Sequence, residues 1–581
     1  MSFVQRIVIV TVALYALSAL FMSMYARPRK QLQENLTNGI APKPFYKFNN
    51  PYLSLKALEK LDIFVPVDDA YLKNGPVAKN KYDQPFLGLK NDDNYCEKQR
   101  NFFVKNPSVV LNDMNVLFES GPSHLIRKKA LPGIGIDIQP NVGDHVARSQ
   151  TSKFLFNINP NVGIFWTYRA MNEYKHVGKH FSCLSQMSNQ ILGHRALGRK
   201  DYVAENAIAY GKNFKSRPQC FSHNEFFPET WLLDEKEDCE NFFRILNSYE
   251  YEEGKKEKHI LFIRKIASGA HRGEGVQPVD KGEEADLRKI YENGKKCGAV
   301  QKNYIIQTYV HNPLLLNGHK FDFRVYLLVA STDPLIAYYH DGFLRVTLAD
   351  YDASSSDKKV LLTNLALNKQ IYDDAKGGNL YEGMDEEALK QAQQWSYQKL
   401  QDYLMEKEII KDSNWLDNHL RPQFKKAMIH LVRMTSHAFR KDKTTFQLFG
   451  VDFLLDTNLN LWFIEANSGP AIGGYSVPME KFIVEMVQDH FDIVYGILRS
   501  RVKRILNYIN KIVQEGEVIL LSTGEVEIKN LEAKRREFDK VSKNYFEKEF
   551  EPKPTNGFKK IVDANYEGVD MYQGYLEPEC L

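Results

Sequence analysis

The chain has 581 residues, of which 43% are hydrophobic, and this is enough to bury a large core in two or three domains. Its formal net charge of +4 is small for this length and predicts no nucleic-acid-binding surface. The six cysteines form no CxxC pair and no Cys/His ligand spacing, so the sequence predicts free thiols in a reducing compartment and neither a zinc site nor a disulfide framework.

The first residues carry a targeting signal. Residues 7–25 (IVIVTVALYALSALFMSMY) are uncharged and about long enough to cross a bilayer as a helix. A cleaved signal peptide is the alternative, although its apolar run is usually shorter. Because Arg27, Arg29 and Lys30 follow the run and only Arg6 precedes it, the charges predict a single-pass membrane protein with its main domain on the cytosolic side. In a mitochondrial inner membrane, the equivalent side is the matrix.

Residues 31–152 are rich in Asn, Pro, Asp and Gly, which interrupt short apolar runs. This composition predicts an extended connector that wraps another part of the protein and has no core of its own. Asn35-Leu36-Thr37 has the form of a glycosylation sequon, which has a meaning only if it faces a secretory lumen.

From about residue 153 the pattern changes to short strands and helices. A helix is expected just after Arg199-Lys200, and the strand in HILFIRKIASGAHRGEG runs into a loop with Gly269, Gly273 and Gly275. Glycines let backbone N–H groups approach a phosphate, but this loop taken alone is interpreted as an ordinary hairpin turn. The next apolar strand, at 303–310, contains Gln307.

Residues 312–329 (NPLLLNGHKFDFRVYLLV) predict a strand with two different faces. Lys320, Asp322 and Arg324 alternate with three apolar residues, Phe321, Phe323 and Val325. An isolated K-x-D-x-R pattern is explained as well by a strand with one wet face. Farther on, QLFGVDFLLDTNLNLWFIEANSGP predicts two strands around a turn, with Asp452 on the first and Glu465 and Asn467 on the second. Oxygen ligands opposite a basic strand suit a magnesium nucleotide.

The remaining segments are less specific. Arg345 and Lys369, taken individually, are interpreted as solvated surface charges, and helices are expected within 381–407 and 421–437. Residues 511–581 predict a charged helical tail followed by an irregular strap, with a docking helix favoured over a basic contact with an acidic partner.

Together these blocks resemble the tubulin-tyrosine-ligase-like family of ATP-grasp amino-acid ligases over roughly residues 153–510. The resemblance lies in IIQTYVHNPLLLNGHKFDFRVYLLV, LLTNLALNK and FQLFGVDFLLDTNLNLWFIEANSGP, supported upstream by GHRALGRKD and FPETWLL. It implies an α+β, ATP-grasp-like domain in which two mixed or antiparallel sheets clamp the nucleotide. The expected order is an anchor (1–30), a connector (31–152), this domain (153–510) and the tail (511–581).

The resemblance also implies a site that binds ATP and Mg²⁺. It places Lys200 and Lys265 at the phosphates, Gln307, Tyr309 and Val310 at adenine, Thr363 and Asn364 near the nucleotide, and Asp452, Glu465 and Asn467 at the metal. Lys320, Asp322 and Arg324 would line the phosphate and acceptor side, and Arg345 would stabilise the reacting groups.

Some positions depart from the family pattern. Leu361 stands where His is frequent, Thr308 where Lys is common, and Ile266 where Pro is favoured. Glu274 lies between two glycines of a loop that is one residue longer than usual, and a carboxylate turned toward triphosphate would oppose binding.

Two functions of different classes follow. The first is a membrane-anchored ligase that adds glutamate or glycine to tubulin or another acidic protein through an acyl phosphate. The second is a catalytically reduced structural or nucleotide-binding subunit of a membrane complex, with a mitochondrial complex as one alternative. A P-loop enzyme or protein kinase is excluded because the chain has neither GxxxxGK[ST] nor an HRD-type loop.

Overall fold

The computed structural model describes residues 45–61, 95–118, 125–136, 162–166, 183–222, 225–248, 261–267, 275–363, 386–473, 475–565 and 570–581. The chain divides into Met1–Tyr46 and Lys47–Leu581, and the fold below is that of the second unit. No helix of these described ranges is long and apolar enough to cross a bilayer. The apolar run at 7–25, predicted to be an anchor, lies outside them.

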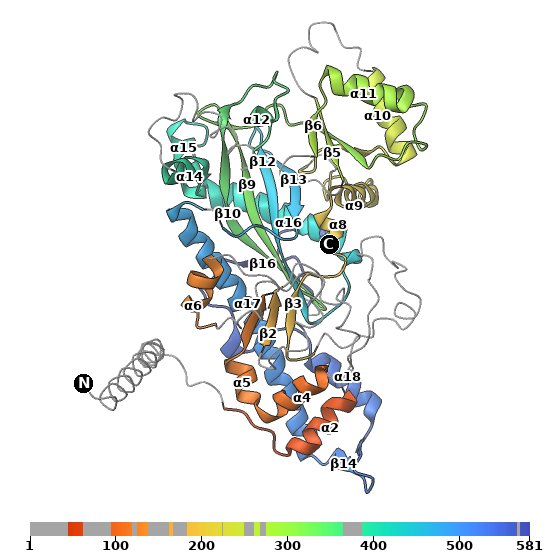
Figure 1. Ribbon diagram of the computed structural model, residues 1–581, viewed down its shortest axis with the longest axis vertical. Helices are drawn as coiled ribbons and strands as arrows, with labels where there is room; N and C mark the ends of the chain where they lie inside the picture. Colours follow the sequence, from red (N-terminus) through yellow and green to blue (C-terminus); the bar gives the residue numbers. More distant parts are fainter. Residues whose placement is uncertain are drawn as a thin grey trace, which may run out of the picture. The chain divides into compact units, whose positions relative to one another are not determined.

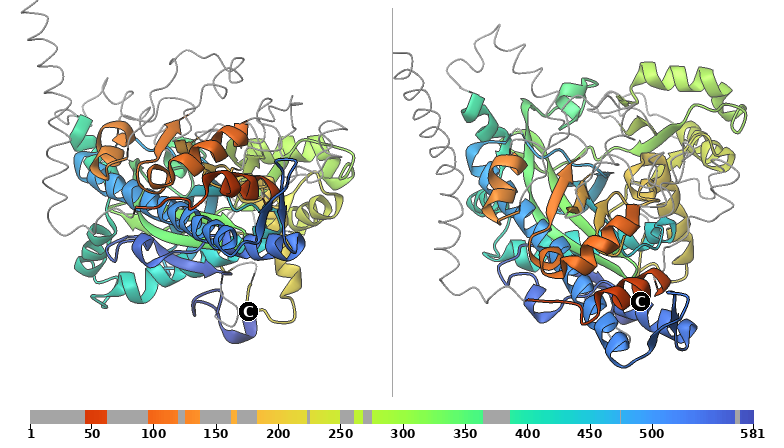
Figure 2. Two further views of the ribbon diagram at one scale, coloured as in Figure 1. Left: turned by 90° about the horizontal axis from the view of Figure 1, so that it is seen from below. Right: turned by 60° about the horizontal axis from the view of Figure 1, so that its bottom comes forward.

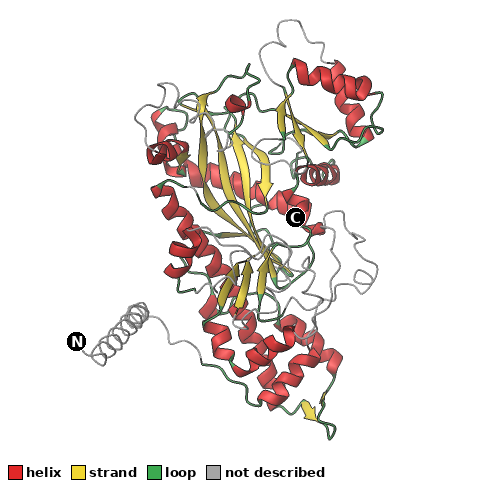
Figure 3. Cartoon of the chain, in the orientation of Figure 1, coloured by secondary structure: helices red, strands yellow, loops and turns green. Residues whose placement is uncertain are grey.

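A ten-stranded mixed sheet forms the centre of this unit (Figure 1, Figure 3). Its main path is β1-β2-β3-β12-β9-β10-β11, and β13, β16 and β8 pair with β12, β10 and β9 respectively. The strands are β1 (Asn115–Phe118), β2 (Val162–Trp166), β3 (Met187–Asn189), β8 (Leu315–Leu316), β9 (His319–Thr332), β10 (Leu335–Asp350), β11 (Gln394–Trp395), β12 (Thr445–Leu455), β13 (Leu461–Asn467) and β16 (Lys559–Asp563).

The two faces of β9 have the different roles that its alternation predicts. Phe323 packs edge to face on Phe424 of α16 (Arg421–Thr435), with ring centroids 5.2 Å apart, and Phe453 of β12 packs on the same ring at 5.4 Å. Asp322 and Arg324 therefore point to the opposite face, because side chains alternate along a strand. The α16 face holds the apolar core, and the other face carries the charges.

A smaller antiparallel sheet lies on the charged side. Its order is β4 (Thr230–Leu232), β7 (Tyr304–Thr308), β5 (Phe262–Ile266) and β6 (Val276–Pro278). Helices α10 (Lys236–Ser248) and α11 (Lys281–Tyr291) cover its outer face through a separate core that includes Phe242, Leu287 and Tyr291 (Figure 1). Helices α8 (Arg195–Gly198) and α9 (Lys200–Asn213) precede this sheet in the chain.

The prediction of an extended connector at 31–152 is wrong for the part of it that the structure describes. This part contains α2 (Pro51–Leu61), α4 (Tyr95–Lys105), α5 (Pro107–Asn112), α6 (Leu131–Gly133) and β1, which pairs in parallel with β2. Leu58, Leu61 and Leu111 are buried. The long helix α17 (Val477–Gln514) packs against α2 and α5 (Figure 2). The apolar partner of these short helices thus comes from a distant part of the chain, which local composition does not reveal.

The tail is also more than a charged helix and a strap. It contains a hairpin of β14 (Val518–Leu520) and β15 (Val526–Ile528), and α18 (Leu531–Val541) lies in the predicted charged segment. Strand β16, which the sequence analysis did not predict, pairs antiparallel with β10 and extends the central sheet. The helices expected at 381–407 and 421–437 correspond to α14 (Glu386–Gln393), α15 (Tyr397–Glu406) and α16, and a short α12 (Lys358–Leu361) follows β10.

The prediction of free thiols is wrong. Cys220 is bonded to Cys580 and Cys239 to Cys297, with Cα atoms 5.1 and 5.6 Å apart, and Cys183 is disulfide-bonded as well. No free cysteine occurs in the described ranges. The partners lie 360 and 58 residues apart in sequence, so the spacing of the cysteines does not predict which of them pair.

Gly342 sets the approach of β10 to β9 and gives a testable expectation. A Cβ atom at this position would lie 1.5 Å from the carbonyl oxygen of Arg324, so a substitution must move one strand. We expect Gly342→Ala to lower the free energy of unfolding by about 2 kcal/mol or more, measured by denaturant titration. Gly469→Ala is the control, since a Cβ there meets nothing within 4 Å. Equal stability of the two variants would contradict this account.

Candidate active site

Two buried carboxylates and two guanidinium groups meet on the charged face of the central sheet. Asp322 and Arg345 are cross-strand partners on β9 and β10, and Arg324 and Asp452 are partners on β9 and β12. Arg345 donates from Nε and Nη2 to the two Asp322 oxygens at 2.7 and 2.6 Å, and its Nη2 also lies 2.8 Å from Asp452. Arg324 donates to Asp452 at 2.6 and 3.1 Å.

The cluster is balanced in charge, and Arg345 is its bridge. Burial raises the pKa of Asp322, while Arg345 and the Thr363 hydroxyl, which donates to Asp322, act in the opposite direction. Burial also works against the charge of Arg345, but Asp322 and Asp452 hold its pKa well above the ordinary value. The interpretation of Arg345 as a solvated surface charge is therefore wrong, because its neighbours on two other strands bury and pair it.

Lys320 is a buried ammonium group beside this cluster. Its Nζ donates to the Leu361 carbonyl at 2.8 Å and to the Tyr309 hydroxyl at 2.9 Å, and it lies 4.5 Å from the centre of the Tyr309 ring. Burial lowers the pKa of Lys320 to about 7, with Asp322 opposing the change and Lys265 adding to it. Leu361 lacks the polar side chain that is frequent at this position, but its backbone carbonyl still provides a polar contact to Lys320.

Lys265 comes from the smaller sheet and connects the two sheets. Its Nζ donates to Gln307 Oε1 at 2.6 Å and to the carbonyl of Ile464 on β13 at 3.3 Å. Burial lowers the pKa of Lys265 to about 8, and the nearby Lys200 ammonium lowers it further while Glu465 raises it. Gln307 also donates to the Thr230 hydroxyl at 2.9 Å. The sequence analysis missed Thr230, although it belongs to the quoted FPETWLL block.

Glu465 and Asn467 lie next to this lysine at the end of β13. Glu465 is the cross-strand partner of Asp452, accepts from Asn467 at 3.3 Å, and lies 3.0 Å from the Lys200 Nζ. Burial opposes the charge of Glu465, but Lys200 and Lys265 hold its pKa at about 2. The described ranges contain no group of three or more His, Cys, Asp or Glu side chains that could hold a metal.

Most of these side chains line one cavity between the two sheets. The predicted site residues that line it are Lys200, Lys265, Gln307, Tyr309, Val310, Lys320, Asp322, Arg345, Thr363, Asp452, Glu465 and Asn467. Arg324 is not among the lining residues. Its side chain lies over Gly450 and donates to Asp452, which does line the cavity. Gly275 and the departing residues Ile266, Thr308 and Leu361 line the cavity. Asn364, Gly269, Gly273, Glu274 and Lys369 lie outside the described residues.

The comparison with known families decides the relationship. The model of the tubulin-tyrosine ligase family matches residues 179–503, which is more than half of the chain. The chain belongs to the tubulin-tyrosine ligase family. The resemblance drawn from the three sequence blocks is therefore confirmed.

Relatives within this family carry names of different activities. The protein polyglycylase TTLL10 of Macaca fascicularis is 28% identical over 330 residues, which cover 54% of this chain and 48% of the relative. The inactive polyglycylase TTLL10 of Homo sapiens is 28% identical over 327 residues, covering 54% and 44%. The tubulin polyglutamylase TTLL7 of Mus musculus is 30% identical over 300 residues, covering 50% and 29%. In each case the match spans less than half of the relative's length, and an active and an inactive relative are equally similar. The names of these relatives therefore do not assign one activity to this chain.

Proposed function

We propose that this chain is an ATP-dependent ligase that joins a free amino acid, glutamate or glycine, to a carboxylate of tubulin or another acidic protein. The single observation that carries the proposal is the cavity in which lysines from both sheets face paired carboxylates on adjacent strands. A cysteine nucleophile is not needed for such a reaction, and both Cys239 and Cys297, next to the smaller sheet, are held in a disulfide. Relatives named polyglycylase and polyglutamylase support the same reaction class.

The residues that line the cavity suit the parts of ATP. Tyr309 and Val310 directly follow β7, and their backbone and apolar neighbours could receive adenine. Lys200, Lys265 and Lys320 present ammonium groups to phosphates. ATP supplies a phosphoryl group to an oxygen of the acceptor carboxylate with release of ADP, and the amino-acid nitrogen then forms an amide bond as phosphate leaves. The lysines and Arg345 offset negative charge at the reacting oxygens.

The donors near Asp452 also fit Mg²⁺. Two carboxylates and one amide oxygen, from Asp452, Glu465 and Asn467, are hard ligands on neighbouring strands. Lys200 and Arg345 contact these carboxylates, so cations already compensate their charge. Bound Mg²⁺ would supply neutralisation of phosphate charge and orientation of the nucleotide.

Glu465→Gln tests this assignment. The variant keeps the shape of the side chain and removes the charge, so we expect magnesium-dependent ATP consumption to fall by about 100-fold or more. The measurement is phosphate release by the purified chain over a series of Mg²⁺ concentrations. Glu525→Gln, an exposed site on the β14–β15 hairpin, is the matched control and should retain wild-type activity. If Glu465→Gln kept its activity and its Mg²⁺ dependence, the metal assignment would be lost.

The second candidate is a nucleotide-binding or structural subunit that has lost turnover. It is favoured by the complete pairing of the carboxylates Asp322, Asp452 and Glu465 and by the inactive human relative. Incubation with ATP, each amino acid and either tubulin or another acidic protein as acceptor separates the two. Nucleotide binding without ATP consumption for any acceptor would favour the subunit. In either case, residues 7–25 are proposed to be a membrane anchor, with a cleaved signal peptide as the alternative.

A further inference from the structure

The cysteines of this domain carry information on its redox environment. The structure describes the side chains of five of the six cysteines, and all five are disulfide-bonded: Cys183, Cys220, Cys239, Cys297 and Cys580. Cytosolic thiols are kept reduced, whereas disulfides persist in secretory and extracellular compartments. Free thiols would not need to lie within bonding distance of partners that are 360 and 58 residues away in sequence.

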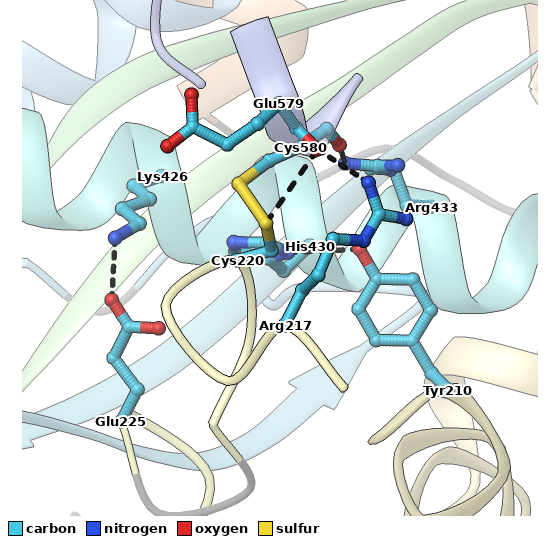
Figure 4. The surroundings of a disulfide bond; sticks show 9 residues. All are labelled: Tyr210, Arg217, Cys220, Glu225, Lys426, His430, Arg433, Glu579 and Cys580. Carbon is cyan, nitrogen blue, oxygen red and sulfur yellow. Dashed lines mark hydrogen bonds and ion pairs between the residues drawn. A yellow bond between two sulfur atoms is a disulfide. The ribbon is translucent and has the colours of Figure 1, made fainter. Parts of the chain in front are cut away.

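The Cys220–Cys580 pair is part of the packed core. Both cysteines are almost fully buried, at 1% and 2% exposure. Arg433 donates to the carbonyl of Cys580 at 2.6 Å, and Arg217 donates to the carbonyl of Glu579 (Figure 4). Two separate arginines thus hold the backbone that carries Cys580, so the sulfur atoms meet in a built environment and not by chance on a mobile surface.

The second pair is independent of the first. Cys239 lies on α10 and is fully buried, and Cys297 follows α11, so their bond joins the two helices that cover the smaller sheet. The two disulfides therefore stabilise two different cores of the molecule, one under each of the two sheets.

We propose that the domain faces an oxidising compartment, a secretory lumen or the cell exterior, and that its acceptor is an acidic protein of that compartment and not cytosolic tubulin. This substrate class rests on the proposed ligase function. A second cavity, continuous in its lining with the first through Lys200, Lys265 and Glu465, also carries Arg195 and Arg199. Asp201 already pairs with Arg199, but Arg195 and the two lysines still exceed Glu465 in charge, which suits an acidic acceptor. The apolar run at 7–25, as an anchor or as a signal peptide, is the element that would direct the chain there.

This orientation is opposite to the one predicted from the charges around residues 7–25. Three basic residues after the run against one before it form a small bias, and long domains are translocated largely regardless of such charges. Disulfides between buried cysteines depend on the redox environment of the whole domain. They therefore indicate its side of the membrane more directly than the charges that flank residues 7–25.

A glycosylation reporter tests the orientation. Glu532→Thr converts Asn530-Leu531-Glu532 into an Asn-X-Thr acceptor on the exposed start of α18, where Glu532 has only a surface ion pair with Arg535. In the full chain expressed in eukaryotic cells, we expect this variant to gain one glycan that an endoglycosidase removes. Glu532→Ala, which changes the same residue without creating the acceptor, should gain none.

Protease protection of the same microsomes decides the result if no glycan appears. A domain that is digested only after detergent is added supports the proposal, and a domain that is digested in intact microsomes overturns it. A thiol-reactive polyethylene glycol added to the denatured, unreduced chain gives a separate readout. We expect no modification of the five paired cysteines, whereas five or more additions would overturn the proposal.

These readouts do not depend on catalysis, so the two proposals can fail separately. A lumenal, fully disulfide-bonded chain that never consumes ATP would leave the compartment assignment intact and contradict the ligase. A cytosol-facing chain that consumes ATP with tubulin and an amino acid would do the reverse.

Discussion

Arg345→Met is expected to lower the free energy of unfolding by about 3–5 kcal/mol and to abolish the proposed ligase activity. The buried cluster contains two carboxylates and two guanidinium groups, and Arg345 is the side chain that contacts both Asp322 and Asp452. Its loss leaves Asp322 without a guanidinium partner in a buried site, and an uncompensated buried charge is far more costly than a lost surface ion pair. Urea titration of the apo protein measures the effect without reference to substrate.

The penalty should also depend on pH. Burial raises the pKa of Asp322 above its unfolded value, and the loss of Arg345 removes the main group that opposes this rise. The folded variant therefore holds a proton more readily than the unfolded chain. The loss of stability caused by Arg345→Met is small near the pKa of a carboxyl group in the unfolded chain, at about pH 4. It grows as the pH rises toward the raised pKa of Asp322 in the folded variant. The gap between wild type and variant should accordingly narrow as the pH is lowered from 8 to 5.

Arg535→Met is the control, because its ion pair with Glu532 is exposed and should contribute little. An Arg345→Met protein as stable as this control at pH 8 would mean that the buried cluster is not held by Arg345. A protein of normal stability but without activity would restrict Arg345 to the reaction itself.

The charged face of β9 could be predicted because its information is local. Alternation alone separates Asp322 and Arg324 from Phe323, and the family resemblance supplies Asp452 and Glu465 as their neighbours. The role of Arg345 could not be predicted from its own segment, because the carboxylates that bury it belong to β9 and β12. A charge with solvent around it and a charge between two strands have the same local sequence pattern.

The other differences have the same origin. The short helices α2 and α5 find their apolar partner on α17, and Cys220 finds its partner 360 residues away. Strand β16 is recognised as a strand only once β10 is available as its neighbour. Composition and periodicity describe what a segment can become, whereas these contacts depend on which distant segment the fold brings to it.

Nucleotide binding is expected to take up protons and to weaken as the pH rises. Burial lowers the pKa of Lys320 to about 7 and that of Lys265 to about 8, so both amines are largely neutral at pH 8.5 in the free protein. A bound triphosphate favours the ammonium forms and raises both pKa values. Binding at pH 8.5 should then take up between about one and two protons, and affinity should fall by up to about 10-fold per pH unit for each proton.

Calorimetry with a non-hydrolysable ATP analogue, in buffers of different ionisation enthalpy, measures this uptake directly above pH 7.5, where the magnesium nucleotide itself no longer titrates. Lys320→Met should weaken binding by about 10- to 100-fold at pH 7 and should remove one of the protons taken up at pH 8.5. Lys529→Met, at an exposed position beyond the β14–β15 hairpin, should change neither quantity. Wild-type binding without proton uptake would mean that triphosphate does not reach these lysines. Uptake that falls by about one proton in Lys320→Met, together with the loss of affinity, would place the charge of the nucleotide beside Lys320, where the two sheets meet.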